Sequence, residues 1–133
     1  MPRLVVLVPP WATFEYRDDP SRRYNAKADT ILGEVTGNET VLRHPAYAGN
    51  IKDMADPRIS PLHADLAGLP PMLILVGGGE LFLSEGIQLA EKAAAAGVEV
   101  ELSAMPGMPP EHAVVYPDRA ESRRSFAVVK SFV

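Results

Sequence analysis

The sequence predicts an α/β fold with about three parallel strands and helices on the faces of the sheet. Three neighbouring segments support this prediction. Met72–Val76 is an unbroken apolar run, typical of a strand buried on both faces of a parallel sheet. Glu85–Ala96 has the apolar spacing of a helix. In Val98–Leu102 apolar residues alternate with glutamate, which indicates a half-buried strand. Strand, helix and strand in this order form the repeating unit of a parallel sheet.

The first strand of the chain is predicted at Leu4–Val8, a short run rich in valine and leucine that suits a central parallel strand. Pro9 and Pro10 follow it and end the strand, because proline cannot donate a backbone hydrogen bond to a sheet.

The helix over Glu85–Ala96 has plausible signals at both ends. Ser84 is a suitable N-cap, Glu85 suits the positive first turn, and Gly97 suits the stop. The residues expected to pack on the sheet are Ile87, Ala90 and Ala94.

The remaining segments carry weaker patterns. Short helices are predicted at Ala26–Leu32 and Thr40–Ala48, within a polar stretch that has scattered aromatic residues. At the end of the chain, Asp118–Glu121 resembles a capping box that opens a closing helix. The side chains of this helix expected to cover the sheet are Phe126, Val129 and Val133.

An acid and a histidine follow the two strands that flank the predicted helix. Glu80 stands after the glycines that end Met72–Val76, and His112 lies in the proline-rich loop after Val98–Leu102. Right-handed crossovers bring such loops to the same end of a parallel sheet, so the two side chains could meet. A carboxylate beside an imidazole fixes its tautomer and stabilises the imidazolium formed during proton transfer. The alternative is a solvated glutamate and an ordinary loop histidine.

The order of several short motifs resembles the C-terminal half of the hormone-sensitive-lipase-like esterases, a family with the α/β-hydrolase fold. The matching segments are Ser60-Pro61-Leu62, Leu69-Pro70-Pro71, Glu80 and His112, and Leu4–Trp11 resembles the strand after the nucleophile. The resemblance implies a partial α/β-hydrolase fold that lacks the N-terminal half of the sheet. It also implies a single domain over 1–133, a cap-like insertion over roughly 12–56, and no metal or organic cofactor. The acid position in the family is more often Asp than Glu.

The nucleophile of that fold is absent from the sequence. The family's serine lies in a G-x-S-x-G turn, and none of the seven serines here has a glycine two residues away on both sides. In a complete hydrolase the strand before Leu4–Val8 would carry this serine, so the open edge of Leu4–Val8 is expected to self-associate or to pair with a missing half.

Composition excludes several other classes of function. A net charge of −4 provides no basic surface for nucleic acid. No run approaches the roughly twenty apolar residues of a membrane-spanning helix, so no stable membrane insertion is expected. The chain has no cysteine and Met1–Trp11 is a poor signal peptide, which favours a cytoplasmic location. His44 and His63 are too isolated to predict a metal site.

By resemblance, the chain is predicted to be part of a carboxylic-ester hydrolase that acts on a small-molecule ester through an acyl-enzyme. Glu80 and His112 would supply the acid and the histidine, and the isolated chain would be inactive. Two alternatives remain open. One is a catalytically inactive truncated remnant, and the other is a non-catalytic binding or association module that uses its aromatic residues and open strand edge.

Overall fold

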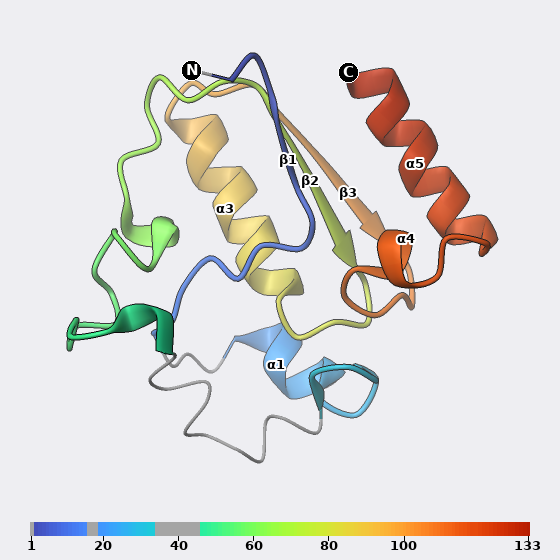
Figure 1. The fold of residues 1–133 in the computed structure, drawn as a ribbon, viewed down its shortest axis with the longest axis horizontal. Helices are drawn as coiled ribbons and strands as arrows, with labels where there is room; N and C mark the ends of the chain where they lie inside the picture. The colour runs from blue at the N-terminus through green and yellow to red at the C-terminus, as the bar shows by residue number, and fades with distance from the viewer. Residues whose placement is uncertain (1, 16–18, 34–45) are drawn as a thin grey trace.

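The sheet of the computed structural model, which describes residues 2–15, 19–33 and 46–133, has three parallel strands in the order β1-β2-β3. They are β1 (Val5–Leu7), β2 (Met72–Gly77) and β3 (Val100–Met105). Met72 is paired with Val5 on one side and with Val100 on the other. The predicted α/β class with three parallel strands is therefore confirmed (Figure 1).

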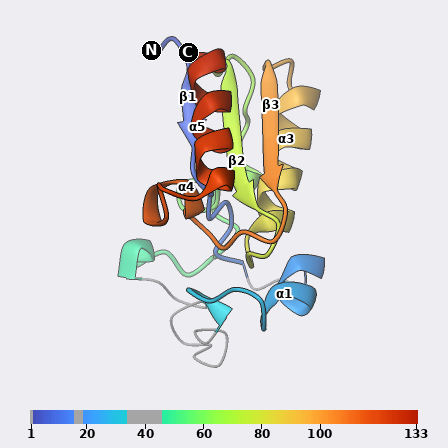
Figure 2. The same cartoon turned by 90° about the vertical axis from the view of Figure 1, so that its right-hand side faces the viewer.

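The central strand β2 is buried along its whole length, because helices cover both faces of the sheet. Helix α3 (Leu83–Ala95) lies on one face and α5 (Ala120–Phe132) on the other (Figure 2). Leu73 and Ile74 have no exposed surface at all. A strand enclosed on both faces needs apolar side chains at every position, which explains the continuous apolar run.

The third strand begins two residues later than predicted and ends three residues later. Val98 is not part of it, because the turn after α3 occupies residues 96–99. In this turn Gly97 adopts φ 82° and the N–H of Val98 donates to the carbonyl of Ala93 at 3.0 Å. Val98 still packs in the core. The first strand is shorter than the predicted Leu4–Val8.

Helix α3 packs on the sheet through a face that shares only Ala90 with the predicted one, since Ala94 is exposed. Its buried residues are Glu85, Gly86, Leu89, Ala90 and Ala93, whereas Ile87 is 44% exposed. The predicted N-cap was also wrong: Phe82 holds that position, and the hydroxyl of Ser84 accepts the backbone N–H of Ser21. Gly86 lies so close to β2 that an added Cβ would be 2.6 Å from Val76, and this close approach fixes the buried face.

Helix α5 also packs through unexpected residues. Phe126 and Val133 are 47% and 77% exposed, so the predicted apolar face does not cover the sheet. The fully buried side chains are instead Ser122 and Ser125, whose hydroxyls form hydrogen bonds with His112. The N-cap is Arg119, without a side-chain capping bond, so the predicted capping box is not formed.

Four short helices complete the described part of the chain: α1 (Pro20–Asn25), η2 (Ala46–Ala48), η3 (Pro61–His63) and α4 (His112–Val115). The helix predicted at Ala26–Leu32 was wrong, since these residues form turns. The carboxylate of Asp29 accepts the backbone N–H groups of Ile31 and Leu32, which competes with helical bonding. Apart from η2, the predicted helix at Thr40–Ala48 lies outside the described residues.

No helix within the described ranges has both the length and the apolar character that crossing a bilayer requires.

Candidate active site

Glu80 lies at the carboxyl end of β2 and is completely buried. Its Oε2 accepts the backbone N–H of Gly77 at 2.8 Å. Its Oε1 is equally buried and has no hydrogen-bond partner in the described structure. The loop around it is held from α1, because the side-chain amide of Asn25 donates to the carbonyls of Gly78 and Glu80. Glu80 is therefore a fixed carboxyl group with one unused oxygen.

The environment of Glu80 favours its neutral form. Burial is the main reason that the pKa of Glu80 rises to about 8, and repulsion from Asp29, Glu111 and Glu85 adds to the rise. The hydrogen bond from Gly77 opposes the shift. A cationic group at Oε1 would favour the ionised form, which is the form that can stabilise an imidazolium.

His112 begins α4 and is only 3% exposed. Its Nε2 lies 2.9 Å from the hydroxyl of Ser125, and the hydroxyl of Ser122 donates to its backbone carbonyl. Burial lowers the pKa of His112, opposed by a hydrogen bond with the backbone of Pro109 and by Glu121. The imidazole is thus held mainly neutral against α5.

The two predicted site residues follow neighbouring strands, at the end of the sheet that faces α1 and α4 (Figure 1). No hydrogen bond or ion pair joins Glu80 and His112 in the described residues. Their pairing stays a prediction. The sequence analysis missed Ser122 and Ser125. Two serines three positions apart on a helix were their only signal, and they gave no indication of facing a histidine.

The loop between β3 and α4 is pressed against the end of β2. The N–H groups of Gly78 and Gly79 donate to the carbonyls of Met105 and Met108, at 2.7 and 3.0 Å. The backbone at Glu111 has φ 54°, a left-handed conformation that non-glycine residues rarely adopt. The position of His112 therefore depends on how this loop packs.

Gly77→Ala is expected to destabilise the protein by about 1–3 kcal/mol, because its Cβ would be 2.1 Å from the backbone carbonyl oxygen of Met108 and overpack the loop. Urea denaturation would measure the loss. Gly79→Ala is the matched control, since its Cβ would meet nothing closer than 3.4 Å. An equal loss of stability in Gly77→Ala and Gly79→Ala would contradict the close approach of the Met108 carbonyl to Gly77.

A cavity of about 180 Å³ lies beside this loop. Its walls are mainly apolar, with one carboxylate, and consist of Pro9, Ile31, Leu32, Phe82, Pro110 and Glu111. A space of this size and character suits a small apolar group better than a charged one.

A buried ion pair ties the segment after β1 to α3. Arg22 Nη2 lies 2.6 Å from Glu85 Oε1, and the N–H groups of Ala12 and Thr13 donate to Glu85 Oε2 at 2.9 and 3.1 Å. Arg22 also lies over the ring of Phe82, 5.7 Å from its centroid. The ion pair could not be predicted from the sequence, because Arg22 is 63 residues from Glu85.

No group of three or more histidine or acidic side chains in the described ranges is arranged to hold a metal ion.

Comparison with known proteins gives consistent results. A family model described as "alpha/beta hydrolase fold" matches residues 1–115. The chain is 34% identical over 108 residues to an "Esterase" of Acinetobacter venetianus, covering 81% of this chain and 34% of that protein. It is 31% identical to an "Acetyl-hydrolase" of Streptomyces hygroscopicus, covering 100% of this chain and 43% of that protein. Among solved structures, a hormone-sensitive lipase from a metagenome library superposes with a TM-score of 0.84 at 34% identity, covering 99% of this chain and 44% of the other. The chain thus spans less than half the length of these relatives.

Proposed function

The chain belongs to the family of the α/β-hydrolase fold, and we propose that it is the acid- and histidine-bearing part of a carboxylic-ester hydrolase. The observation that carries the proposal is Glu80. It is a completely buried carboxyl group at the end of a central strand, with one oxygen fixed by Gly77 and the other without a partner among the described residues. A buried polar atom without a partner is costly, so a functional partner is a physical reason for keeping it.

In the proposed reaction a serine from outside these 133 residues attacks the ester carbonyl carbon. His112 accepts the serine proton and passes it to the alcohol oxygen as the carbon–oxygen bond breaks, which leaves an acyl-enzyme. Water then repeats the sequence and releases the acid. Glu80 would accept a hydrogen bond from the imidazole and stabilise its charged form. To accept the serine proton at Nε2, His112 must first leave Ser125, whose hydroxyl now lies 2.9 Å from that atom.

We propose that the missing half pairs along β1. This strand has only half-buried residues and, within the described residues, pairs only with β2. Its other edge presents unpaired backbone donors and acceptors, which suits the addition of a further strand. The relatives are more than twice as long as the part that this chain matches, which is consistent with such a partner.

A catalytically inactive chain is the second candidate, and a specific observation favours it. Both serine hydroxyls on the buried face of α5 are engaged with His112, one through the ring and one through the backbone carbonyl. In this second candidate the anchored imidazole would contribute to packing rather than transfer a proton. The aromatic side chains do not favour one alternative over the other, since Trp11 packs against Phe14 and Phe82, whereas Tyr24 and Tyr47 are largely exposed.

The chain alone is expected to give no turnover of short p-nitrophenyl esters, with the same result for His112→Ala. Mixing it with the preceding half of the Streptomyces relative is then expected to produce turnover. Glu80→Gln and His112→Ala would each lower that turnover by about 10²–10⁴-fold, the usual contribution of acid–base groups.

Two outcomes would contradict the proposal. Turnover by the chain alone that His112→Ala abolishes would show that a nucleophile lies within these 133 residues. If the mixture still turned over the ester after His112→Ala, His112 would not be the group that transfers the proton.

A further inference from the structure

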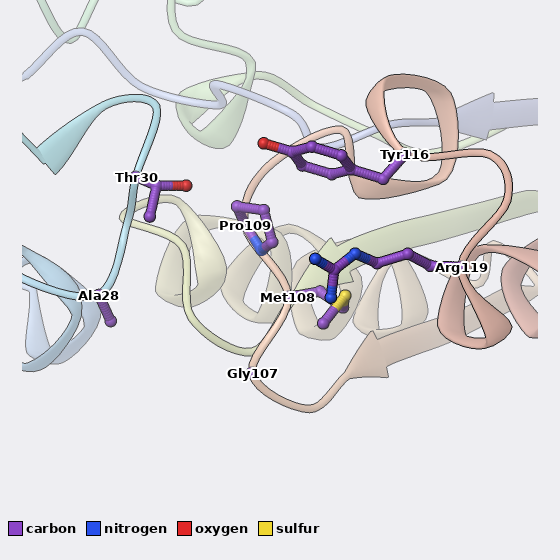
Figure 3. A pocket seen from close by; sticks show the side chains of 7 residues that line it. All are labelled: Ala28, Thr30, Gly107, Met108, Pro109, Tyr116 and Arg119. Carbon is purple, nitrogen blue, oxygen red and sulfur yellow. The ribbon is translucent and has the colours of Figure 1, made fainter.

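A second cavity, of about 290 Å³, lies on the loop that carries His112 and belongs to none of the machinery described above. It is open to solvent on one side and is lined by three segments far apart in the sequence. They are Ala28 and Thr30 after α1, Gly107–Pro109 after β3, and Tyr116 with Arg119 before α5 (Figure 3). The volume is close to the lower end of the range of small-molecule sites, so a ligand of a few heavy atoms would fit.

Arg119 gives this cavity a positive charge that no acid in its wall balances. Within the described structure its guanidinium forms no hydrogen bond or ion pair, and it lies over the ring of Tyr116, 5.6 Å from the ring centroid. Neighbouring arginines are engaged differently: Arg123 donates to the carbonyl of Asp118 at 2.7 Å, and Arg124 lies 3.7 Å from Glu121. Arg119 is therefore a cation held in place by an aromatic ring, with its hydrogen-bond donors available.

Two hydroxyl groups complete the polar part of the wall. Figure 3 shows the hydroxyls of Thr30 and Tyr116 turned toward each other across the cavity, with the Arg119 guanidinium extending toward Met108. Neither hydroxyl forms a hydrogen bond among the described residues. The remaining surface is apolar and comes from Ala28, Met108 and Pro109.

We propose that this cavity binds a small carboxylate with a short apolar chain. The planar guanidinium of Arg119 can donate two parallel hydrogen bonds to a carboxylate, and the hydroxyl groups can donate to the same oxygens. The short chain would lie against Met108 and Pro109. A metal cation is excluded by the chemistry of the wall, which contains no carboxylate or imidazole. Binding requires no turnover, so this site does not depend on the proposed function.

The test is a titration of the folded chain with butyrate, followed by calorimetry and by the NMR shifts of the Thr30 and Arg119 amides. Butyramide is the neutral isostere, and inorganic phosphate is an anion without an apolar chain. Butyrate is expected to bind saturably and at least 10-fold more tightly than either. Arg119→Gln is expected to weaken butyrate binding at least 10-fold. Arg124→Gln should leave it unchanged, since Arg124 lies in the first turns of α5, close to Arg119 in the sequence, but not in the cavity.

Arg119 is exposed, so its replacement should not impair folding, and an unchanged circular dichroism spectrum would verify this. Equal binding of butyrate and butyramide would overturn the proposal, as would butyrate binding that Arg119→Gln leaves intact. Tighter binding of phosphate than of butyrate would also overturn it, because the apolar part of the wall would then contribute nothing.

Discussion

Glu85→Ala is expected to lower the free energy of unfolding by about 3–5 kcal/mol, the usual cost of breaking a buried ion pair from one side. Glu85 has no exposed surface, and its two oxygens bind Arg22 and the N–H groups of Ala12 and Thr13. Without the carboxylate, the guanidinium of Arg22 and two backbone donors would remain buried and unpaired. The segment from Ala12 to α1 would then lose its attachment to α3.

Urea denaturation of both proteins would measure this loss. Glu91→Ala is the matched control, because Glu91 is an exposed glutamate on the same helix, and its effect should stay within about 0.5 kcal/mol. The double variant Glu85→Gln/Arg22→Met should be less destabilised than the sum of its single variants, since removing both charges leaves neither unpaired. A loss in Glu85→Ala no larger than that in Glu91→Ala would contradict the buried network.

Glu80 is expected to make the protein less stable as pH rises from 5 to 8, by roughly 1 kcal/mol per pH unit. The pKa of Glu80 is about 8 in the folded chain and 4.5 as the ordinary value for glutamate. Between these two values the folded state keeps a proton that the unfolded state has lost. The folded state therefore binds more protons, and the free energy of unfolding must fall with rising pH until Glu80 ionises in the folded state as well.

Glu80→Gln removes this dependence, so the variant should gain about 3 kcal/mol relative to the wild type between pH 5 and pH 8. Urea denaturation of both proteins at several pH values would give the difference. His112, whose pKa is lowered, contributes with the opposite sign but equally in both proteins. The exposed Glu99→Gln serves as the control and should leave the pH profile unchanged. Parallel profiles for the wild type and Glu80→Gln would show that burial does not keep Glu80 protonated.

Much of the fold could be predicted from the chain alone. The apolar run Met72–Val76 indicated a strand buried on both faces, and β2 occupies these positions with one more residue. The order of strand, helix and strand predicted parallel pairing, which the register of β2 with β3 confirms. The motifs around Leu69–Pro71 and Glu80 indicated the family, and the comparisons confirm it.

The helix faces could not be predicted in this way, and the reason is physical. Apolar periodicity assumes that buried positions are apolar, yet α3 buries Glu85 and α5 buries Ser122 and Ser125. Each of these side chains is polar and becomes compatible with burial only through a partner. Arg22 is 63 residues from Glu85, and His112 is 13 residues from Ser125. A sequence pattern cannot reveal such partners before the chain is folded.

The same distinction applies to the candidate site. That Glu80 and His112 follow neighbouring strands at one end of a parallel sheet could be predicted from the chain, because strand order and crossover handedness fix it. The direction of each side chain depends on how the folded chain packs. Glu80 turns to the N–H of Gly77, and His112 turns to Ser125. A buried polar group takes whichever partner the packed chain brings within hydrogen-bond distance, and that choice depends on the packing of α5 and of the loop on Gly77.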